Sequence, residues 1–397
     1  METKRGSPMS RTRIVAPVTP ADYRLLAERR LPRFLFDYAD GGANDELTMA
    51  ANAADFGRLT LRQRVMRDVS AIDTSTSLAG QPVSMPLALA PVGMAGMFAR
   101  RGEVQGMRAA GRAGVPFTLS TVGICAIEEV RAAAAGPFWF QLYMMRDREV
   151  VQRLLKRARD GGCTALLFTV DLPVAGLRHR DTRNGMIGRD SLRAKLAKAW
   201  QIGTRPGWVG DVGLRGKPHA FGSLTDVVAD PTDLHAYKAW IDAQFDPTVT
   251  WKDIEWLRGL WDGKLFIKGV LEPDDARAAA DAGADGVVVS NHGGRQLDSV
   301  ASSIAKLPGV VAAAGDRLEV LVDGGIRSGI DVLKALALGA RGALIGRPWI
   351  WAMAGAGSQG LSDLLTTFNL ELRVAMALAG VRRIDEITPQ ILDQGDS

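Results

Sequence analysis

The segment SNHGGRQLD, residues 290–298, carries side chains that could act on an acid substrate. His292 can serve as a base near neutral pH, and Arg295, three residues later, can hold a carboxylate through two parallel hydrogen bonds. Earlier in the chain, Asp171 could orient the histidine and Arg178 could form a second clamp. Taken alone, Asp171 could equally be a helix cap or a turn residue. The set predicts base chemistry on a substrate that carries a carboxylate.

Two glycine-rich segments near the end of the chain indicate a phosphate site. They are VDGGIRSG, residues 322–329, and LIGR, residues 344–347. Glycines let backbone N–H groups approach a phosphate, a helix N-terminus adds a partial positive charge, and arginine supplies a charged fork. A pair of ordinary glycine turns is the alternative. The pattern does not say which molecule carries the phosphate.

Eight short apolar runs, with segments of helical period between them, must position these residues. The runs are 87–91, 116–120, 138–143, 165–171, 264–270, 286–292, 319–324 and 342–347. The helical segments include 103–113, 148–160, 273–282 and 328–338. Near-continuous apolar strands that alternate with helices predict a covered parallel sheet, and eight such units close a (β/α)8 TIM barrel. An open doubly wound sheet is less favoured, because no GxGxxG follows the first strand.

Most of the predicted strands end in polar or glycine residues. In a barrel of this kind the C-terminal strand ends and the loops after them build the active site. The alternative is that strands simply end where polar loops begin. The residues at these ends are Ala90, Pro91, Ser120, Gln141, Tyr143, Thr169, Asp171, Lys268, Ser290, His292, Asp323, Gly346 and Arg347.

About ninety residues separate the fourth strand from the fifth, which predicts a large insertion at about 178–250. Residues 178–217 hold ten basic and three acidic residues, a net of +7 against +5 for the whole chain. Leu192, Leu196 and Trp200 recur every four residues in this stretch. The segment at about 188–217 is therefore either a membrane-surface helix or a solvated lid. Nucleic acid is not an expected partner, because no binding motif accompanies the charge.

The remaining chain predicts an N-terminal cap and a long last helix. We expect a flexible tail over residues 1–19 and one barrel domain over 20–390, with a helix at 22–30 and a terminal helix at 361–378. The uncharged run at 74–99 is interrupted by prolines and glycines, so a buried strand with its turns is expected rather than a membrane span.

Composition narrows the class of protein. With 47% hydrophobic and 23% charged residues the chain is globular rather than disordered. Two cysteines cannot make a disulfide framework, which favours a reducing compartment. Four scattered histidines show no metal-ligand spacing, so no metal is expected. No secretory signal stands out, and we expect a soluble or peripheral protein.

The chain resembles the FMN-dependent α-hydroxy-acid dehydrogenase and oxidase family over about residues 20–380. The resemblance lies in FDYADGGANDE, LALAPVG, FTLST, WFQLY, TVDLPVAGLRHRD, IKGV, SNHGGRQLD, VDGGIR and IGR. The stretches MAGMFARRGEVQ and FDPTVTWKDIEW, with the basic insertion, are most similar to its bacterial respiratory, quinone-linked L-lactate dehydrogenases. The resemblance implies FMN as cofactor and oxidation of an L-2-hydroxy acid to the 2-oxo acid.

The resemblance also implies a role for each matching residue. His292 would be the base paired with Asp171, and Arg178 and Arg295 would bind the substrate carboxylate. Tyr38 and Tyr143 would hydrogen-bond substrate oxygens. Residues near the flavin would be Ala90, Pro91, Ser120, Gln141, Thr169, Lys268 and Ser290. Residues at the ribityl chain and phosphate would be Asp323, Gly324, Gly325, Arg327, Gly346 and Arg347.

Departures from the family pattern bear on the substrate. Val122 stands where glycolate oxidases have a tryptophan, and Gly93 stands where some lactate-oxidising relatives have alanine. Both changes enlarge the pocket, so L-lactate is favoured while mandelate or another large hydroxy acid stays open. The resemblance further implies quinone or another respiratory acceptor rather than oxygen, a cytoplasmic place at the inner membrane, and a homotetramer or homo-octamer. A phosphate-binding barrel without redox chemistry remains the alternative from another class.

Overall fold

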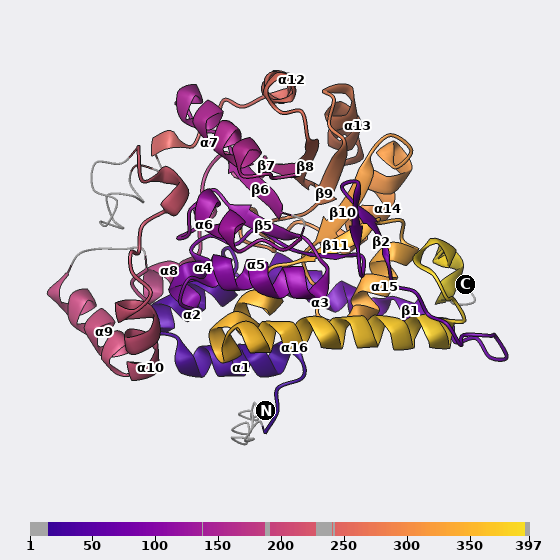
Figure 1. The fold of residues 1–397 in the computed structure, drawn as a ribbon, viewed down its shortest axis with the longest axis horizontal. Coiled ribbons are helices and arrows are strands. Elements are labelled where there is room, and N and C mark those ends of the chain that lie inside the picture. The colour runs from indigo at the N-terminus through magenta and orange to yellow at the C-terminus, as the bar shows by residue number, and fades with distance from the viewer. Residues whose placement is uncertain (1–14, 137, 187–190, 228–239, 241–242, 394–397) are drawn as a thin grey trace, which may run out of the picture.

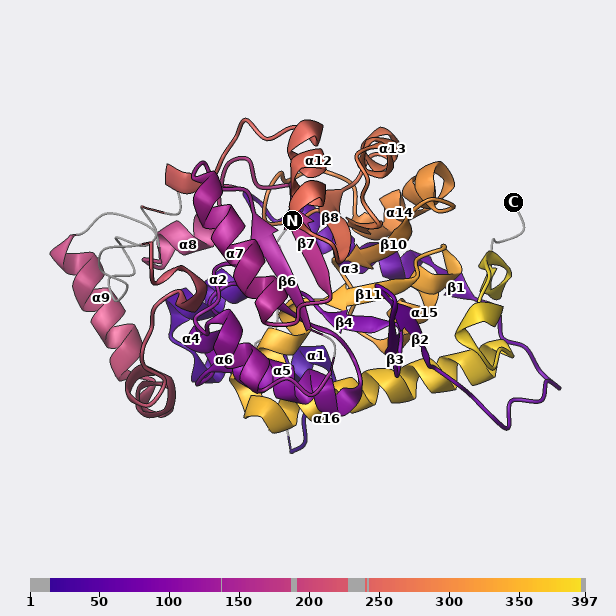
Figure 2. The same cartoon turned by 45° about the horizontal axis from the view of Figure 1, so that its top comes forward.

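The computed structural model describes residues 15–136, 138–186, 191–227, 240 and 243–393. Eight parallel strands, β4 to β11, pair in chain order around a closed barrel, and β11 returns to pair with β4 (Figures 1 and 2). The predicted (β/α)8 barrel is confirmed. The strands are β4 Leu87–Leu89, β5 Phe117–Ser120, β6 Phe138–Tyr143, β7 Ala165–Thr169, β8 Lys264–Val270, β9 Gly286–Val289, β10 Glu319–Asp323 and β11 Gly342–Ile345.

Several strands end earlier than the sequence predicts. Residues 170–171 and 290–292 were expected in strands but lie in the loops that follow β7 and β9. His292 has a positive φ of 57°, which a strand cannot accommodate. Arg347, expected at the end of the last strand, is instead the first residue of a helix. Because the backbone at His292 is not extended, the parallel pairing of β9 ends before this residue.

An outer ring of helices covers the barrel. It consists of α5 Gly102–Ala113, α6 Ile127–Ala132, α7 Arg148–Asp160, α12 Trp251–Leu260, α13 Pro273–Asp281, α14 Ser303–Ala314, α15 Gly329–Ala337 and α16 Arg347–Ala379. Each helix buries one stripe; in α7 the buried positions include Val150, Val151, Leu154 and Leu155. The expected last helix at 361–378 lies within α16, whose two helical stretches meet at a break at Gly357; the stretch before the break was not expected.

The N-terminal cap consists of α1 Pro20–Arg30, α2 Arg33–Asp40 and α3 Leu47–Arg58. Thr19 and Asp22 form a capping box that begins α1. Helix α1 packs along α16 beneath the barrel, as Figure 1 shows. The short α4 Ala95–Phe98 follows β4, and β1 Thr60–Leu61 pairs antiparallel with β12 Leu392–Asp393. The turns η3 Ile384–Glu386 and η4 Pro389–Ile391 precede β12.

A hairpin closes the N-terminal end of the barrel. Strands β2 Thr76–Leu78 and β3 Gln81–Val83 pair antiparallel, and Leu78 belongs to the cluster that fills the barrel interior. The uncharged run at 74–99 is thus this hairpin, β4 and α4, as expected, and not a membrane span. In the part of the chain that the structure describes, no helix combines the length and apolar character needed to cross a membrane.

The insertion between β7 and α12 lies at one end of the molecule. Its described elements are α8 His179–Arg183, α9 Leu192–Gly203, α10 Pro206–Trp208, η1 Val209–Leu214 and η2 Gly222–Leu224. The Trp208 indole N–H donates to the Met97 carbonyl at 2.8 Å, and the Arg205 guanidinium donates to the Leu31 carbonyl at 3.0 Å. These bonds fix α10 to α4 and to the end of α1. Parts of the expected segments 178–250 and 188–217 fall outside the described residues.

Candidate active site

The barrel's alternation of side chains explains why polar groups collect at one end. Apolar residues of successive strands fill the interior, among them Trp139, Leu167, Phe266, Val288, Leu321 and Leu344. Because alternate residues of a strand share a face, the residue two positions later also points inward. Those positions are Gln141, Thr169, Lys268, Ser290, Asp323 and Gly346. The strand registers place Thr169 beside both Tyr143 and Lys268, and Ser120 beside Gln141.

His292 and Asp171 form a direct pair at this end of the barrel. The distance from His292 Nδ1 to Asp171 Oδ1 is 2.8 Å, and the backbone N–H of His292 donates to Ser290 Oγ at 3.0 Å. Burial opposes ionisation of Asp171, but His292 and Lys268 outweigh it and hold the pKa of this carboxyl below its ordinary value. The ionised carboxylate can accept a hydrogen bond from an N–H at Nδ1. In the neutral ring Nε2 then carries no hydrogen and is able to accept a proton.

A bulge in β8 makes room for this pair. The pairing of β8 with β9 shifts between Lys268 and Val270, and Gly269 adopts a φ of 108°. A Cβ on Gly269 would lie 2.6 Å from Cβ of Asp171. Glycine is therefore required for the close approach of β8 to the loop that carries Asp171.

Arg178 and Arg295 converge on Tyr38 from separate loops. Their Cζ atoms lie 5.1 and 5.0 Å from the centre of the Tyr38 ring. Burial and the neighbouring Arg178 lower the pKa of Arg295. Burial, Asp171 and Tyr38 raise the pKa of Tyr143, so its phenol stays protonated as a donor. Two partly desolvated guanidinium groups and a phenol donor suit a carboxylate.

Gly93 and Val122, the two departures from the family pattern, lie together near Tyr38. A Cβ on Gly93 would lie 2.8 Å from Cγ2 of Val122 and 3.7 Å from the Tyr38 hydroxyl. Gly93 and Val122 are thus in contact, and the room that glycine leaves is partly taken by Val122. Both residues lie close to the Tyr38 hydroxyl.

Lys268 is the buried cation of the barrel interior. Its Nζ lies 2.9 Å from Ser290 Oγ and 2.7 Å from Asp323 Oδ2, and all three side chains are buried. Within the described residues, Gln141 Nε2, Thr169 Oγ1 and Asp323 Oδ1 are buried and have no hydrogen-bond partner. Buried polar atoms are nearly always paired, so unpaired ones around a lysine fit a planar, polar ligand such as the FMN ring system. A Cβ on Gly346 would meet Ala90 and Val92 only at ordinary contact distances of 3.9 and 4.0 Å, so packing within the protein does not require glycine there.

Arg327 and Arg347 are half-buried cations that fit its phosphate. No carboxylate oxygen of the described residues lies within 4.0 Å of either guanidinium, and burial lowers the pKa of both. Arg327 stacks over Trp351 at 5.1 Å. Arg347 donates to three main-chain carbonyls, which leaves two of its five N–H donors for a ligand. An anion would offset the cost of burying these charges.

The two glycines after β10 are needed partly for packing, a reason the sequence did not indicate. Gly324 and Gly325 have φ values of 92° and 89°. A Cβ on Gly325 would lie 1.8 Å from the backbone oxygen of Asn52 in α3. The loop therefore rests directly on the cap as well as bordering the predicted phosphate position.

Sequence reasoning missed the residues that brace the SNHGGRQLD loop. Asn291 exchanges amide hydrogen bonds of 2.8 Å with Asn52. Gln296 donates to the Asp171 and Val174 carbonyls at 2.9 Å, which ties the loops after β7 and β9 together. Asp298 accepts the backbone N–H of Thr48 at 2.8 Å at the start of α3. All three lie inside the motif, but their roles depend on partners far along the chain.

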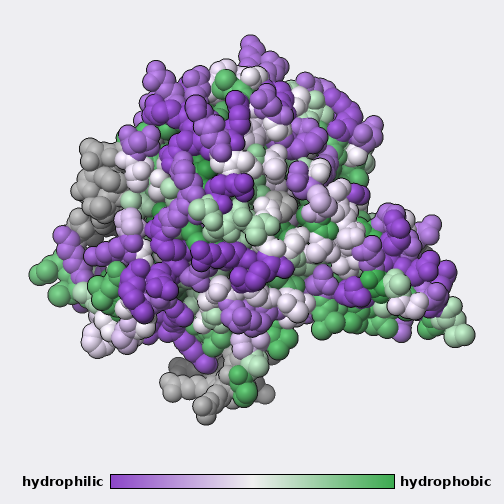
Figure 3. Space-filling view, viewed as in Figure 1, coloured by the Kyte–Doolittle hydropathy of each residue, from purple (hydrophilic) through white to green (hydrophobic). Residues whose placement is uncertain are grey.

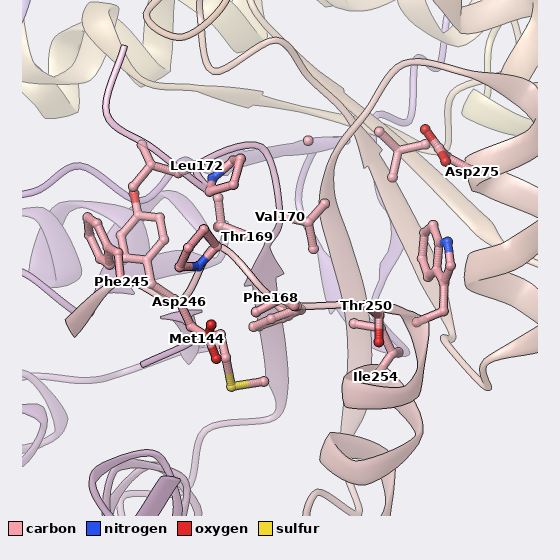
Figure 4. A pocket seen from close by; sticks show the side chains of 17 residues that line it. Met144, Phe168, Thr169, Val170, Leu172, Phe245, Asp246, Thr250, Ile254 and Asp275 are labelled. Carbon is pink, nitrogen blue, oxygen red and sulfur yellow. The ribbon is translucent and has the colours of Figure 1, made fainter. Parts of the chain in front are cut away.

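A cavity of about 310 Å³ borders the site, since its lining includes Tyr143 and Thr169 (Figure 4). It is lined by Phe168, Val170 and Ile254, and its aromatic wall includes Phe245, whose ring centre lies 5.2 Å from that of Tyr143. Phe168 belongs to the outer cluster of the barrel. The described lining includes neither His292 nor the arginines, so the cavity lies on the Tyr143 and Thr169 side of the site rather than around the histidine–aspartate pair.

A barrel with a histidine–aspartate pair, two guanidinium groups and a cradle for a phosphorylated planar ligand is the arrangement of a cofactor-dependent oxidoreductase. The model of the FMN-dependent dehydrogenase family matches residues 27–394. The L-lactate dehydrogenase of Caulobacter sp. (strain K31) is 53% identical over 94% of this chain and 98% of its own. That of Ectopseudomonas mendocina (strain ymp) is 52% identical over 94% and 97%.

Solved structures agree with these relatives. The monotopic membrane protein (S)-mandelate dehydrogenase superposes with a TM-score of 0.89 at 34% identity, over 95% of this chain and 99% of its own. A mandelate oxidase superposes with a TM-score of 0.80 at 38% identity, over 95% and 98%. The chain belongs to the FMN-dependent dehydrogenase family. Its cofactor is FMN, and its reaction class is the oxidation of a hydroxy acid.

Proposed function

We propose that this protein oxidises L-lactate to pyruvate with FMN as cofactor. The observation that carries the proposal is the His292–Asp171 pair beside two guanidinium groups over one tyrosine ring. A 2-hydroxy acid offers a hydroxyl to the base and a carboxylate to the clamps in one geometry. The choice of lactate is supported by relatives named L-lactate dehydrogenase at 50–54% identity.

Each residue near the substrate has one task in this proposal. Nε2 of His292 takes the proton that the substrate loses, and Asp171 stabilises the resulting imidazolium. Arg178 and Arg295 bind the carboxylate, while the hydroxyls of Tyr38 and Tyr143 hydrogen-bond substrate oxygens. When bound, FMN would accept the two electrons and the second proton of the oxidation.

A second group of residues holds the cofactor. Lys268 places a positive charge beside the ring, where it stabilises negative charge that develops on reduction. The other ring contacts are Ala90, Pro91, Ser120, Gln141, Thr169 and Ser290. The ribityl chain and phosphate contacts are Asp323, Gly324, Gly325, Arg327, Gly346 and Arg347.

We further propose that electrons pass to quinone at a membrane surface. Helix α9 buries none of its residues, and Leu192, Leu196 and Trp200 are 75%, 62% and 75% exposed. Figure 3 shows apolar colour at the end of the molecule that α9 occupies. Exposed apolar residues on a basic helix suit an anionic bilayer, with the protein held peripherally on the cytoplasmic side. The similarity to (S)-mandelate dehydrogenase, a monotopic membrane protein, supports a membrane-surface helix over a solvated lid.

The quaternary state proposed from the family is a homotetramer or homo-octamer. Leu370, Val374 and Leu378 on α16 are 59%, 49% and 54% exposed, and they form an apolar face that a second copy would cover. Light scattering of the purified protein measures this state directly. A monomer at micromolar concentration would contradict it.

The substrate and acceptor are tested together in one steady-state experiment. Purified protein is supplied with L-lactate or (S)-mandelate, and either a short-chain quinone or oxygen. We expect pyruvate formation with L-lactate and quinone, and no hydrogen peroxide. Turnover of mandelate in preference to lactate would identify mandelate as the substrate. Stoichiometric peroxide would identify oxygen, rather than quinone, as the acceptor.

A further inference from the structure

The turn at the end of α2 holds both kinds of functional arginine. Nη1 of Arg295 donates to the carbonyls of Tyr38 and Gly41 at 2.7 and 2.9 Å. Arg347 donates from Nε to the Asp40 carbonyl at 3.0 Å and from Nη2 to the Gly41 carbonyl at 2.8 Å. One carbonyl oxygen, that of Gly41, therefore receives a donor from the substrate side and a donor from the phosphate side. A shift of this turn moves both guanidinium groups.

Arg180 of the insertion grips this same turn. Its Nη1 lies 2.9 Å from Asp40 Oδ2, and its Nη2 pairs with Glu46 Oε2. Its stem packs on the turn, since a Cβ on Gly41 would lie 3.3 Å from Cδ of Arg180. The other oxygen of Glu46 accepts the backbone N–H of Gly42 at 2.9 Å. The Arg180 side chain is 26% exposed and its partners Asp40 and Glu46 are 4% and 18% exposed, so these pairs are only partly screened by solvent.

Arg180 also fixes the start of the insertion. It lies in α8, and Arg178 is the residue that precedes this helix. Arg178 Nε lies 3.2 Å from Asp181 Oδ2 in α8, and α8 packs against α2, so the Arg178–Asp181 and Arg180–Asp40 pairs together place Arg178 at the Tyr38 ring. The Arg180 side chain thus joins the insertion to the end of α2 and the start of α3, which lie far earlier in the chain.

We propose that Arg180 is a positioning residue that holds Arg347 in place for the FMN phosphate and holds Arg178 and Arg295 in place for the substrate carboxylate. Arg180 acts through the Asp40–Gly41 turn and need touch neither ligand. The phosphate part follows from the fold and the cofactor, whereas the substrate part rests on the proposed function.

The cofactor part is tested by titrating apoprotein with FMN and following quenching of flavin fluorescence. Arg180→Gln removes the charge that pairs with both carboxylates, and we expect FMN to bind about tenfold more weakly. Arg183 lies on the same short helix, is exposed and has no partner among the described residues, so Arg183→Gln is the matched control. Arg180→Lys keeps one pairing and is expected to fall between the two.

The substrate part is tested by anaerobic flavin reduction at varied L-lactate concentration. For Arg180→Gln we expect the half-saturating concentration to rise about tenfold while the limiting rate changes by less than about threefold, because the base is untouched. Failure of wild-type protein to react with L-lactate would contradict the proposed function only, and the FMN titration would still decide the role of Arg180.

A simple stabilising role for Arg180 predicts a different result. In that case the melting temperature falls but the FMN affinity and the half-saturating concentration both stay within twofold of wild type, which overturns the proposal. If Arg180→Gln does not yield folded protein, Glu46→Gln decides by the same criteria, because it removes one pairing and leaves the arginine in place.

Discussion

At the scale of single residues, the proposed oxidation depends on the His292–Asp171 pair. We expect His292→Ala to slow reduction of FMN by L-lactate by about a thousandfold, which is the usual contribution of a positioned base. FMN should stay bound, because all the proposed ring contacts except Ser290 lie on other strands. Stopped-flow absorbance at the flavin band measures both quantities. His179→Ala, an exposed histidine of α8, is the control. A wild-type rate for His292→Ala would remove histidine from the role of base.

Acid titration at Asp40 provides a second residue-scale prediction. Burial opposes ionisation of this carboxyl, but Arg24, Arg347 and Arg180 hold its pKa below its ordinary value of 3.8. The unfolded chain therefore binds this proton more readily than the folded protein. The stability that the carboxylate contributes is complete above that ordinary value and is lost as the pH falls through the lower folded value.

Asp40→Asn should accordingly lose about 2 kcal/mol of unfolding free energy at pH 7, since the half-exposed Arg24 and Arg180 lose their buried carboxylate partner. The variant should also lose less stability than wild type on acidification below that value. Denaturant unfolding across a pH series, at one saturating FMN concentration, measures this. Asp262→Asn, at an 88% exposed site, should stay within about 0.5 kcal/mol of wild type. Parallel pH curves for wild type and Asp40→Asn would contradict the assignment.

At the scale of elements, the strands were predictable and their ends were not. Strands of a covered parallel barrel are apolar on both faces, so their residues form runs that a sequence displays. The end of a strand depends on where its side chains must turn, as with His292 at its positive φ. The start of α3 was also hidden, because its N-terminal N–H groups are capped by Asp298 from the loop after β9.

The site residues also divide into those that the sequence predicted and those that it did not. Lys268 and Asp323 each come two residues after an interior strand position, so the strand period and the family motif together predicted them. The roles of Arg180, Gln296 and Asn291 arise from contacts between elements far apart in the chain. No local pattern distinguishes Arg180 from Arg183, since only folding brings Asp40 and Glu46 to one of them.

The contact between the loop after β10 and α3 gives a prediction for an element. Gly325→Ala places a Cβ where the Asn52 backbone oxygen lies, so α3 must move away from the loop. We expect a loss of several kcal/mol and release of FMN. Gly57→Ala in α3 meets no atom within 4 Å and should instead stabilise the protein by about 0.5–1 kcal/mol. Thermal unfolding followed by flavin fluorescence distinguishes them. A Gly325→Ala protein as stable as wild type would refute the packing argument.

At the scale of the whole molecule, the exposed side chains of α9 predict how the protein meets a membrane. We expect the combined substitution of Leu192, Leu196 and Trp200 by glutamate to remove most binding to phosphatidylglycerol vesicles, because it replaces apolar area by negative charge. Activity with an artificial acceptor should persist. Vesicle co-sedimentation measures the binding, and Val65→Glu, at a 74% exposed position outside both α9 and the α16 face, is the control. Unchanged co-sedimentation of the triple variant would reject α9 as the membrane element.

The most direct test of the central claim is anaerobic mixing of the purified protein with L-lactate, D-lactate, glycolate and (S)-mandelate in turn. The account predicts a yellow protein whose flavin absorbance is bleached by L-lactate and not by D-lactate, because the two arginines and His292 hold only one face of the α-carbon toward the cofactor. Flavin that L-lactate leaves oxidised, in protein that retains FMN, would contradict it.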